Sequence, residues 1–475
     1  MNTSKIVLCK LFGKWNSISD FGFRISDFFR QSAIRNPQSA IALVIALISL
    51  VVSQPCWAKD EVAPGAWVSE NMPSLVELYR HLHQSPELSL QEKETAARMA
   101  QELQGVGAKV TAGVGGHGVV GVLENGPGKT LMLRADMDAL PVVEQTGLTY
   151  ASKVRTQDAR GATVGVMHAC GHDVHMTNLI GVARYLAAHR DGWSGTIVFL
   201  MQPAEEMGAG AEGMLEDGLF ARFPRPDFAV ALHVAADLPT GKVNYRPGYA
   251  MANVDNVDIT VKGRGGHGAS PETTVDPIVI AARLVLDLQS IVSREVKPIE
   301  PAVVTVGSIH GGTKHNIISD ECRLQLTLRS LTPQLRKRLQ EAVRRKALAA
   351  AASAGAPEPT IEISEGTPAL FNDPDLTLQV AEILKRTLGD ENLIEGEAVM
   401  GGEDFGRYGL AGVPICMLRL GAISQKRLDE FAARHESPNS LHSPLFYPDV
   451  EDALTTGVPA MASVAMELLP AQHDK

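Results

Sequence analysis

The stretch Thr-Ile-Val-Phe-Leu-Met-Gln-Pro-Ala-Glu-Glu, residues 196–206, decides the fold. Its first six residues are almost all apolar and predict a buried strand, which Gln-Pro ends just before Glu205 and Glu206. Residues 228–233 repeat the arrangement, because another apolar run ends at His233. Polar side chains at the carboxyl ends of strands are typical of an α/β sheet with its site at that edge. We therefore expect an α/β fold with a site beyond these two strands.

A second stretch adds metal-ligand candidates. Residues 167–175 read Met-His-Ala-Cys-Gly-His-Asp-Val-His, so a single glycine separates Cys170 from His172 and both can face one ion. Sulfur and imidazole nitrogen are ligands that Zn²⁺ and its first-row neighbours prefer. His442, in Leu-His-Ser-Pro, joins Glu206 and His233 downstream. Five ligands exceed the needs of one tetrahedral site, so we expect two ions.

Length and composition narrow the class of protein. A chain of 475 residues exceeds what one hydrophobic core normally supports, so two domains are expected. The net charge of −10 argues against a nucleic-acid partner, which needs a basic face. Of the five cysteines, Cys170, Cys322 and Cys416 lie outside the N-terminal region, and three do not make a disulfide framework.

The N-terminal region resembles a targeting segment. Residues 40–52 are apolar apart from Ser49, a run shorter than the roughly 20 residues that span a bilayer. Lysines and arginines precede the run, and Ala58 precedes a polar start at Lys59. This pattern predicts a signal region over 1–58 and a secreted or periplasmic mature chain without a stable membrane span. An uncleaved membrane anchor is the alternative.

Local patterns predict the first elements of the mature chain. A helix is expected over 72–82 and another over 89–103, with Ser89 as its cap and Glu92 as the capping-box partner. The β-rich runs 119–124 and 130–134 flank Asn-Gly-Pro-Gly, which predicts a hairpin. A further helix is expected over 174–189.

The pattern changes after residue 250. Strands are expected at 254–263, 302–309, 321–329 and 359–364, with helices at 276–293 and 331–352. The order β-α-β-β-α-β is ferredoxin-like. Ligand candidates lie on both sides of this unit, which predicts a domain at 251–364 inserted into a discontinuous α/β domain at 71–250 and 365–472.

Eight motifs in order carry a resemblance to a known family. The chain resembles the co-catalytic metallo-aminoacylases and carboxypeptidase-like amidohydrolases, which include hippurate hydrolase, N-acyl-amino-acid amidohydrolase and plant indole-acetyl-amino-acid hydrolase. The motifs are Arg-Ala-Asp-Met-Asp-Ala-Leu-Pro (134–141), Cys-Gly-His-Asp (170–173), Gln-Pro-Ala-Glu-Glu (202–206), Leu-His-Val (232–234), Gly-Gly-His-Gly-Ala (265–269), Gly-Gly-Thr-Lys-His-Asn (311–316), Gly-Gly-Glu-Asp-Phe (401–405) and Leu-His-Ser-Pro (441–444). They cover roughly 71–470.

The resemblance implies a binuclear metallohydrolase whose inserted domain is a lid and dimerisation domain. It implies two divalent ions per subunit (Zn²⁺, Mn²⁺, Ni²⁺ or Co²⁺), bridged by Cys170, and a homodimer or homotetramer. Glu205 would be the general base that accepts a proton from metal-activated water. The remaining roles are Asp138 orienting a ligand, His267 donating to the oxyanion from its own or the other subunit, and Asn316 and Arg329 binding the substrate carboxylate. His168 and His175 are interpreted as structural.

The function implied is hydrolysis of an N-acyl amino acid to a carboxylate and a free amino acid. One alternative is a metallo-dipeptidase or carboxypeptidase acting on short peptides, although such relatives carry His-x-Asp where this chain has Asp136-Met137-Asp138, and Asp in place of Cys170. Another is a non-catalytic periplasmic binding protein, against which the non-ligand Glu205 argues. The lid motif Ala-Ser-Pro-Glu, with Glu272 where many relatives have His, leaves substrate preference open.

Overall fold

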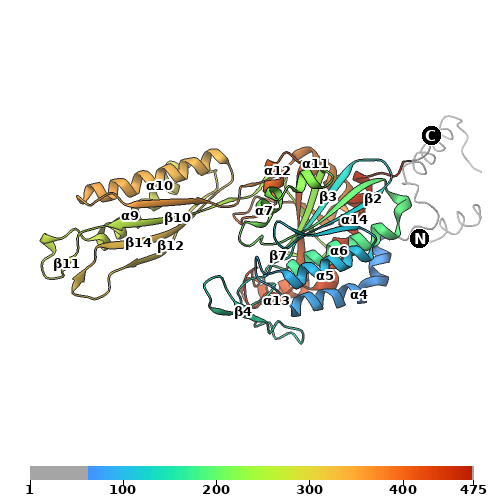
Figure 1. Cartoon of the computed structure of the whole chain (residues 1–475), viewed down its shortest axis with the longest axis horizontal. Helices are drawn as coiled ribbons and strands as arrows, with labels where there is room; N and C mark the ends of the chain where they lie inside the picture. Colours follow the sequence, from blue (N-terminus) through green and yellow to red (C-terminus); the bar gives the residue numbers. More distant parts are fainter. Residues whose placement is uncertain (1–62, 473–475) are drawn as a thin grey trace, which may run out of the picture. The chain divides into compact units, whose positions relative to one another are not determined.

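The computed structural model describes residues 63–472, and its larger sheet has eight strands in the order β1-β2-β6-β3-β7-β18-β8-β17 (Figure 1). The central pairs β6–β3, β3–β7 and β7–β18 are parallel, as expected for an α/β sheet. The eight strands are β1 (Lys109–Val114), β2 (Gly118–Asn125), β3 (Thr130–Asp136), β6 (Gly195–Gln202), β7 (Phe228–Pro239), β8 (Val243–Tyr245), β17 (Leu393–Glu395) and β18 (Ile415–Ile423).

Helices cover both faces of this sheet. Along β3, Leu131 and Leu133 face one hydrophobic core and Met132 faces the other, because successive strand residues point to opposite sides. The first core includes residues of α4 (Pro64–Gln84), α5 (Lys93–Gly105), α6 (His172–Ala188), α11 (Pro374–Leu388) and α14 (Val450–Leu468). The second includes residues of α7 (Gly210–Glu216), α8 (Leu219–Arg222) and α12 (Gly406–Leu410). The result is three layers with the predicted strands in the middle.

The predicted hairpin of 119–124 with 130–134 is wrong. β6 lies between these strands, antiparallel to β2 and parallel to β3. The glycine turn packs against the start of β6 instead, since a Cβ on Gly128 would lie 2.6 Å from the Ser194 carbonyl oxygen. The hairpin partner of β2 is β1, through the turn at 115–117.

The predicted cap of the second helix is also wrong. α5 begins at Lys93, and the Glu87 carboxylate accepts hydrogen bonds from its Glu94 and Thr95 N–H groups at 3.1 and 2.7 Å. Ser89 and Glu92 are therefore free to bind elsewhere, and both contact loops of the candidate site.

The ferredoxin-like unit is confirmed. Its four antiparallel strands lie in the order β12-β14-β10-β15, and its own hydrophobic core includes residues of two helices. In chain order the unit consists of β10 (Asn253–Lys262), α9 (Pro277–Ser290), β12 (Ala302–Gly311), β14 (Glu321–Ser330), α10 (Pro333–Ser353) and β15 (Thr360–Glu365). The boundaries 251–364 stay a prediction.

Short elements complete the described chain. The two-stranded pairs are β4 (Arg155–Gln157) with β5 (Thr163–Gly165), β9 (Gly248–Met251) with β16 (Leu370–Asn372), and β11 (Gly266–His267) with β13 (Ile317–Ile318); α13 is Gln425–Ala433. Over residues 63–472, no helix has both the length and the apolarity needed to cross a membrane. The predicted signal region lies outside the described residues.

Candidate metal centre

The five predicted metal ligands come together at one edge of the large sheet. Donor atoms of Cys170, Glu206 and His442 lie within 4.8 Å of one another, and so do those of His172, Glu205 and Glu206. The Sγ of Cys170 also lies 3.6 Å from Nε2 of His233. The ligands belong to the start of α6, the loop after β6, strand β7 and the loop before α14.

Glycine is required between the first two ligands. Gly171 has φ of 77° and caps the N-terminus of α6. A Cβ on this residue would lie 2.5 Å from Cγ2 of Val234, next to His233. The close approach of the two chain segments explains the Cys-Gly-His spacing, since only glycine adopts this conformation without crowding.

Hydrogen bonds fix which nitrogen of His233 carries a proton. Its Nδ1 lies 2.8 Å from the Val234 carbonyl oxygen, which can only accept, so Nδ1 is protonated. The lone pair is on Nε2, the atom beside Cys170. Imidazoles that bind metal through one nitrogen usually donate through the other in this way.

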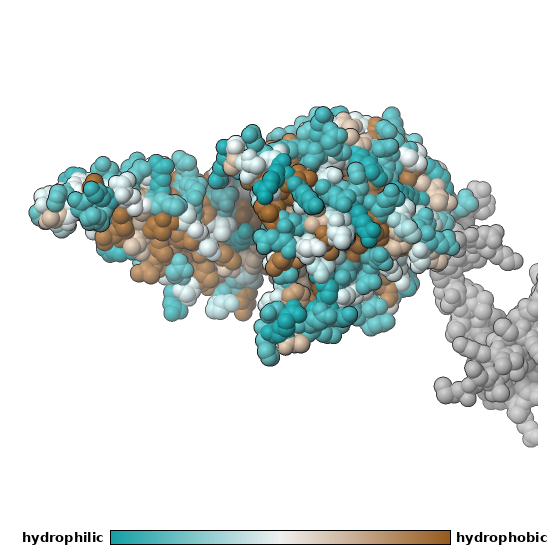
Figure 2. Space-filling model, turned by 90° about the horizontal axis from the view of Figure 1, so that it is seen from below, coloured by the Kyte–Doolittle hydropathy of each residue, from teal (hydrophilic) through white to brown (hydrophobic). Residues whose placement is uncertain are grey.

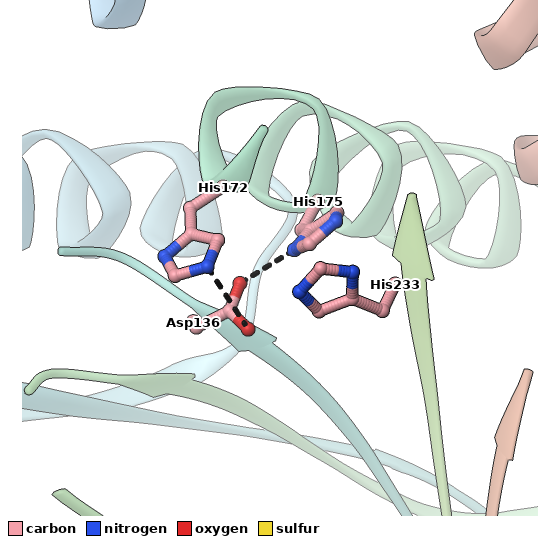
Figure 3. A group of neighbouring side chains, drawn as sticks. All are labelled: Asp136, His172, His175 and His233. Atoms are coloured by element: carbon pink, nitrogen blue, oxygen red, sulfur yellow. Dashed lines mark hydrogen bonds and ion pairs between the residues drawn. The ribbon is translucent and has the colours of Figure 1, made fainter. Parts of the chain in front are cut away.

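His175 is arranged differently, although it lies beside the ligands. Figure 3 shows His172, His175 and His233 around Asp136. Nε2 of His175 accepts from the Val234 N–H at 2.8 Å, and Nδ1 donates to Asp136 at 2.6 Å. Both nitrogens are occupied, which fits the predicted structural role. His168, also predicted to be structural, is buried and neither ring nitrogen has a hydrogen-bond partner.

Buried nitrogen and oxygen atoms that make no hydrogen bond indicate where cations fit. Both ring nitrogens of His172, Oε1 of Glu206 and Oδ1 of Asp138 are buried and make no hydrogen bond. Buried polar atoms without a hydrogen bond are costly and rare, and a bound cation would satisfy those of His172 and Glu206. His442 is the open member of the set, with 55% of its side chain exposed. The donor set of sulfur, nitrogen and carboxylate oxygen therefore fits first-row divalent ions with access from one side.

Without cations, the centre holds an excess of negative charge. Burial, followed by the carboxylates of Glu206, Glu205 and Asp136, raises the pKa of the Cys170 thiol well above its usual value. Burial alone would lower the pKa of His172, but nearby carboxylates, Asp136 first, raise it to about 10. Positive charge brought to this centre would favour the thiolate and the neutral imidazole, the forms that bind metal.

Glu205 is the carboxylate best placed to exchange a proton. It is 8% exposed, and one of its carboxylate oxygens lies within 4.8 Å of a carboxylate oxygen of Glu403 and of Asp404. Burial raises its pKa well above the usual value, with further increases from Glu403, Glu206 and Asp404. A raised pKa suits a general base working near neutral pH.

Asp138 joins the loops on either side of the ligands. Its Oδ1 lies 3.3 Å from Nδ1 of His172. Its Oδ2 accepts from the Ser89 hydroxyl at 2.6 Å and from the Glu206 N–H at 3.0 Å. These contacts fit the predicted orienting role, since they fix one ligand ring and the backbone of another ligand.

Next to Glu205 lies a buried ion-pair network around Arg134. The sequence did not reveal it. Arg134 donates to Asp136 at 2.6 Å, to Glu403 at 2.8 Å and to Asp404 at 3.1 Å. The Arg134 side chain is 1% exposed. Arg134 and Asp136 lie in the same motif as Asp138, but nothing in the spacing identifies Glu403 and Asp404 as their partners.

The inserted-domain candidates are not joined to the metal ligands by any hydrogen bond or ion pair within the described chain. His267 is exposed, and its Nδ1 accepts from the Ala269 N–H at 3.1 Å. The Asn316 carbonyl accepts from the neighbouring Gly268 N–H at 2.9 Å. Arg329 donates to the Met400 carbonyl at 2.8 Å, next to the loop of Glu403. Their predicted roles in substrate binding stay predictions.

Comparison with known proteins identifies the family. The model of peptidase family M20/M25/M40 matches residues 132–463. The chain belongs to this family. The M20 family consists of hydrolases that act on amide bonds, and its inserted-domain architecture is the one described above.

Similar proteins within the family carry different names. Thermostable carboxypeptidase 1 of Saccharolobus solfataricus is 36% identical over 397 residues, covering 83% of this chain and 95% of its own. IAA-amino acid hydrolase ILR1-like 2 of Arabidopsis thaliana is 34% identical over 441 residues, covering 91% and 95%. A solved Bacillus subtilis structure, described as a dinuclear metal-binding M20 peptidase, is 31% identical with a TM-score of 0.69, covering 84% and 99%.

Proposed function

We propose that this M20 hydrolase cleaves N-acyl amino acids to a carboxylate and a free amino acid, with two divalent cations as cofactors. The observation that carries the proposal is the placement of Glu205, a buried carboxyl group of raised pKa directly beside His172 and Glu206, two of the five convergent metal-ligand candidates. A purely structural metal site has no use for such a group.

The chain's own residues take distinct roles. Cys170, His172, Glu206, His233 and His442 would hold the cations, which when bound would acidify a water molecule and polarise the amide carbonyl. Glu205 accepts the proton from that water and passes it to the leaving nitrogen. Asp138 keeps the His172 ring and the Glu206 backbone in place through the contacts described above. The dinuclear Bacillus subtilis relative supports the number of ions.

Two features support an N-acyl amino acid as substrate. The chain has Asp136 and Cys170 where peptide-cleaving relatives are expected to have His and Asp. The Arabidopsis relative, matched over most of both chains, is named an IAA-amino acid hydrolase. The name of the Saccharolobus relative supports the alternative, a carboxypeptidase acting on short peptides.

A substrate panel with metal analysis tests the proposal. Benzoyl-glycine, acetyl-amino acids and dipeptides are assayed with and without chelator, and bound metal is counted under saturating Mn²⁺ or Zn²⁺. We expect turnover of N-acyl amino acids above that of dipeptides, loss of activity with chelator and two ions per chain. Faster turnover of dipeptides would favour the peptidase alternative, and at most one ion per chain would contradict the binuclear centre.

We also propose that the inserted domain forms a homodimer. Figure 2 shows hydrophobic residues gathered on one face of this domain. Leu286 on α9 is 73% exposed and Ile299 is 88% exposed. Within the described chain, β12 is an edge strand paired only with β14, so its other edge is free for another strand. A second copy of the chain would cover both features.

Export is a separate proposal that rests on residues 1–58. The basic segment, the apolar run at 40–52 and Ala58 support a signal that is removed before Lys59. N-terminal sequencing of the protein from its host tests this. We expect a start near Lys59, and a cytoplasmic protein with residues 1–58 intact would contradict export.

A further inference from the structure

Two of the four described non-glycine residues with positive φ lie at the metal centre. The described non-glycine residues with positive φ are Leu90 (66°), Ala204 (51°), His435 (56°) and His442 (69°). His442 is a metal-ligand candidate, and Ala204 directly precedes Glu205 and Glu206. This conformation costs free energy for residues with a Cβ and persists only where the surroundings fix it.

The side chain of Glu92 is one of the groups that fix Ala204. Its Oε1 accepts from the Ala204 N–H at 2.7 Å, and the residue is fully buried. The Ala204 carbonyl in turn accepts from the Ala209 and Gly210 N–H groups, each at 3.1 Å. Glu92 is therefore a contact to the start of this turn from a distant segment of the chain.

The Glu92 carboxyl group is costly to bury, and burial raises its pKa to about 7. Its second oxygen, Oε2, is buried and makes no hydrogen bond. Burying a carboxyl group with one oxygen unpaired is unfavourable, and this cost accompanies the hydrogen bond to the Ala204 N–H, which an apolar residue would leave unpaired. The first turn of α5 does not need Glu92 either, because the Glu87 carboxylate accepts from Glu94 and Thr95.

The same loop reaches the centre at a second point. Three residues before Glu92, the Ser89 hydroxyl donates to Asp138, whose same oxygen accepts from the Glu206 N–H. The loop thus contacts the 203–206 turn at its start through Glu92 and, through Asp138, at its end.

We propose that Glu92 is a positioning residue: its carboxylate fixes the left-handed turn at Ala204 and thereby directs Glu205 and Glu206 toward the metal centre. Because the turn immediately precedes both glutamates, a change in the Ala204 dihedral angles would redirect both side chains. The inference rests on the proposed function only for the roles of Glu205 and Glu206.

The test compares Glu92→Ala and Glu92→Met with Glu92→Gln, which can still accept a hydrogen bond. Metal affinity is measured by competition with a chelator, and kcat and KM with benzoyl-glycine. We expect Glu92→Ala and Glu92→Met to lose about 10–100-fold in metal affinity or kcat, the usual effect of removing a group that supports a ligand. KM should change little, and Glu92→Gln should retain most of both properties.

Glu87→Ala is the matched control, because it removes a carboxylate from the same loop that contacts α5 and not the turn. It should lower the thermal midpoint without changing metal affinity. Ala204→Gly supplies the second control, since glycine adopts the left-handed conformation without strain. Combined with Glu92→Ala, it should recover part of the lost metal affinity.

Wild-type metal affinity and kcat in Glu92→Ala would overturn the proposal, and so would a loss that Ala204→Gly does not reduce. Failure of both Glu92→Ala and Glu92→Met to fold, while Glu87→Ala folds, would assign Glu92 to folding instead. Metal affinity needs no substrate, so a wrong proposed substrate leaves this test intact.

Discussion

Replacing Glu205 by Gln separates catalysis from folding, because the two effects are expected to have opposite signs. Gln has nearly the same shape but cannot accept a proton from water. General-base losses are typically about 10²–10⁴-fold in rate. This range corresponds to about 2.7–5.4 kcal/mol of transition-state stabilisation. The five proposed metal ligands remain, so metal content should stay unchanged.

The effect on stability follows from the raised pKa of Glu205 in the metal-free protein. The folded state then binds this proton more tightly than the unfolded state does. The stabilising contribution of this group is present at pH values below the ordinary Glu pKa and is lost as pH rises toward the folded-state pKa. Glu205→Gln removes this loss, so at neutral pH the metal-free variant should be at least as stable as the wild type.

The assay measures kcat on N-acyl amino acids, metal content, and the thermal midpoint in chelator at about pH 5 and about pH 8. Glu206→Gln is the matched control, because it removes a ligand and should lose an ion. Near-full turnover in Glu205→Gln would refute the assignment of the base. Loss of metal in that variant would show that Glu205 is itself a ligand.

Three further predictions concern other parts of the chain. Burial alone would lower the pKa of His83, but Asp173 and Glu144 raise it to about 9, so its stabilising effect should be full below about pH 6.5 and disappear as pH rises through about 9. In His83→Gln, thermal midpoints measured across this range should lose that dependence; an unchanged profile would contradict the pairing. His267→Ala should lower kcat by about 10²–10³, the loss typical of one oxyanion donor, with metal content unchanged. If His267 acts across a dimer, mixing this variant with Glu205→Gln should restore part of the activity, and no rescue in a mixture shown to exchange subunits would exclude that. Leu286→Glu should shift the protein from dimer to monomer in sedimentation, whereas Leu410→Glu, at a similarly exposed site on α12, should not; a dimer in both would place the interface elsewhere.

The strands and ligands that could be predicted share a physical basis. Ile197–Met201 is apolar because both faces of β6 are buried, and Glu205 and Glu206 follow because the strand ends at the sheet edge. Likewise, Cys170 and His172 flank a glycine that packs against Val234. In each case the local sequence is determined by a local constraint, so pattern and structure agree.

The predicted hairpin at 119–134 was wrong because the pairing of its strands is not determined by the local sequence. Asn-Gly-Pro-Gly is compatible with a tight turn, but the partner of a strand is chosen by burial over its whole length. β6 pairs with β2 on one side and with β3 on the other. Arg134 could not be paired with Glu403 for a related reason, because their contact depends on how distant segments approach the same sheet edge.

Ser89 and Glu92 show that a sequence pattern does not determine which partners its side chains bind. Ser-x-x-Glu before a helix predicts a capping box because both side chains can bond to free N–H groups. The residue types determine that these side chains can accept such hydrogen bonds, whereas the fold determines which partners they have. Once Glu87 accepts from the first turn of α5, the hydroxyl of Ser89 and the carboxylate of Glu92 are available to Asp138 and Ala204. The same Ser-x-x-Glu pattern that could cap a helix here supports the segment that carries Glu205 and Glu206. Glu92 contacts the start of this segment directly, and Ser89 contacts its end through Asp138. A sequence pattern alone cannot distinguish these two uses.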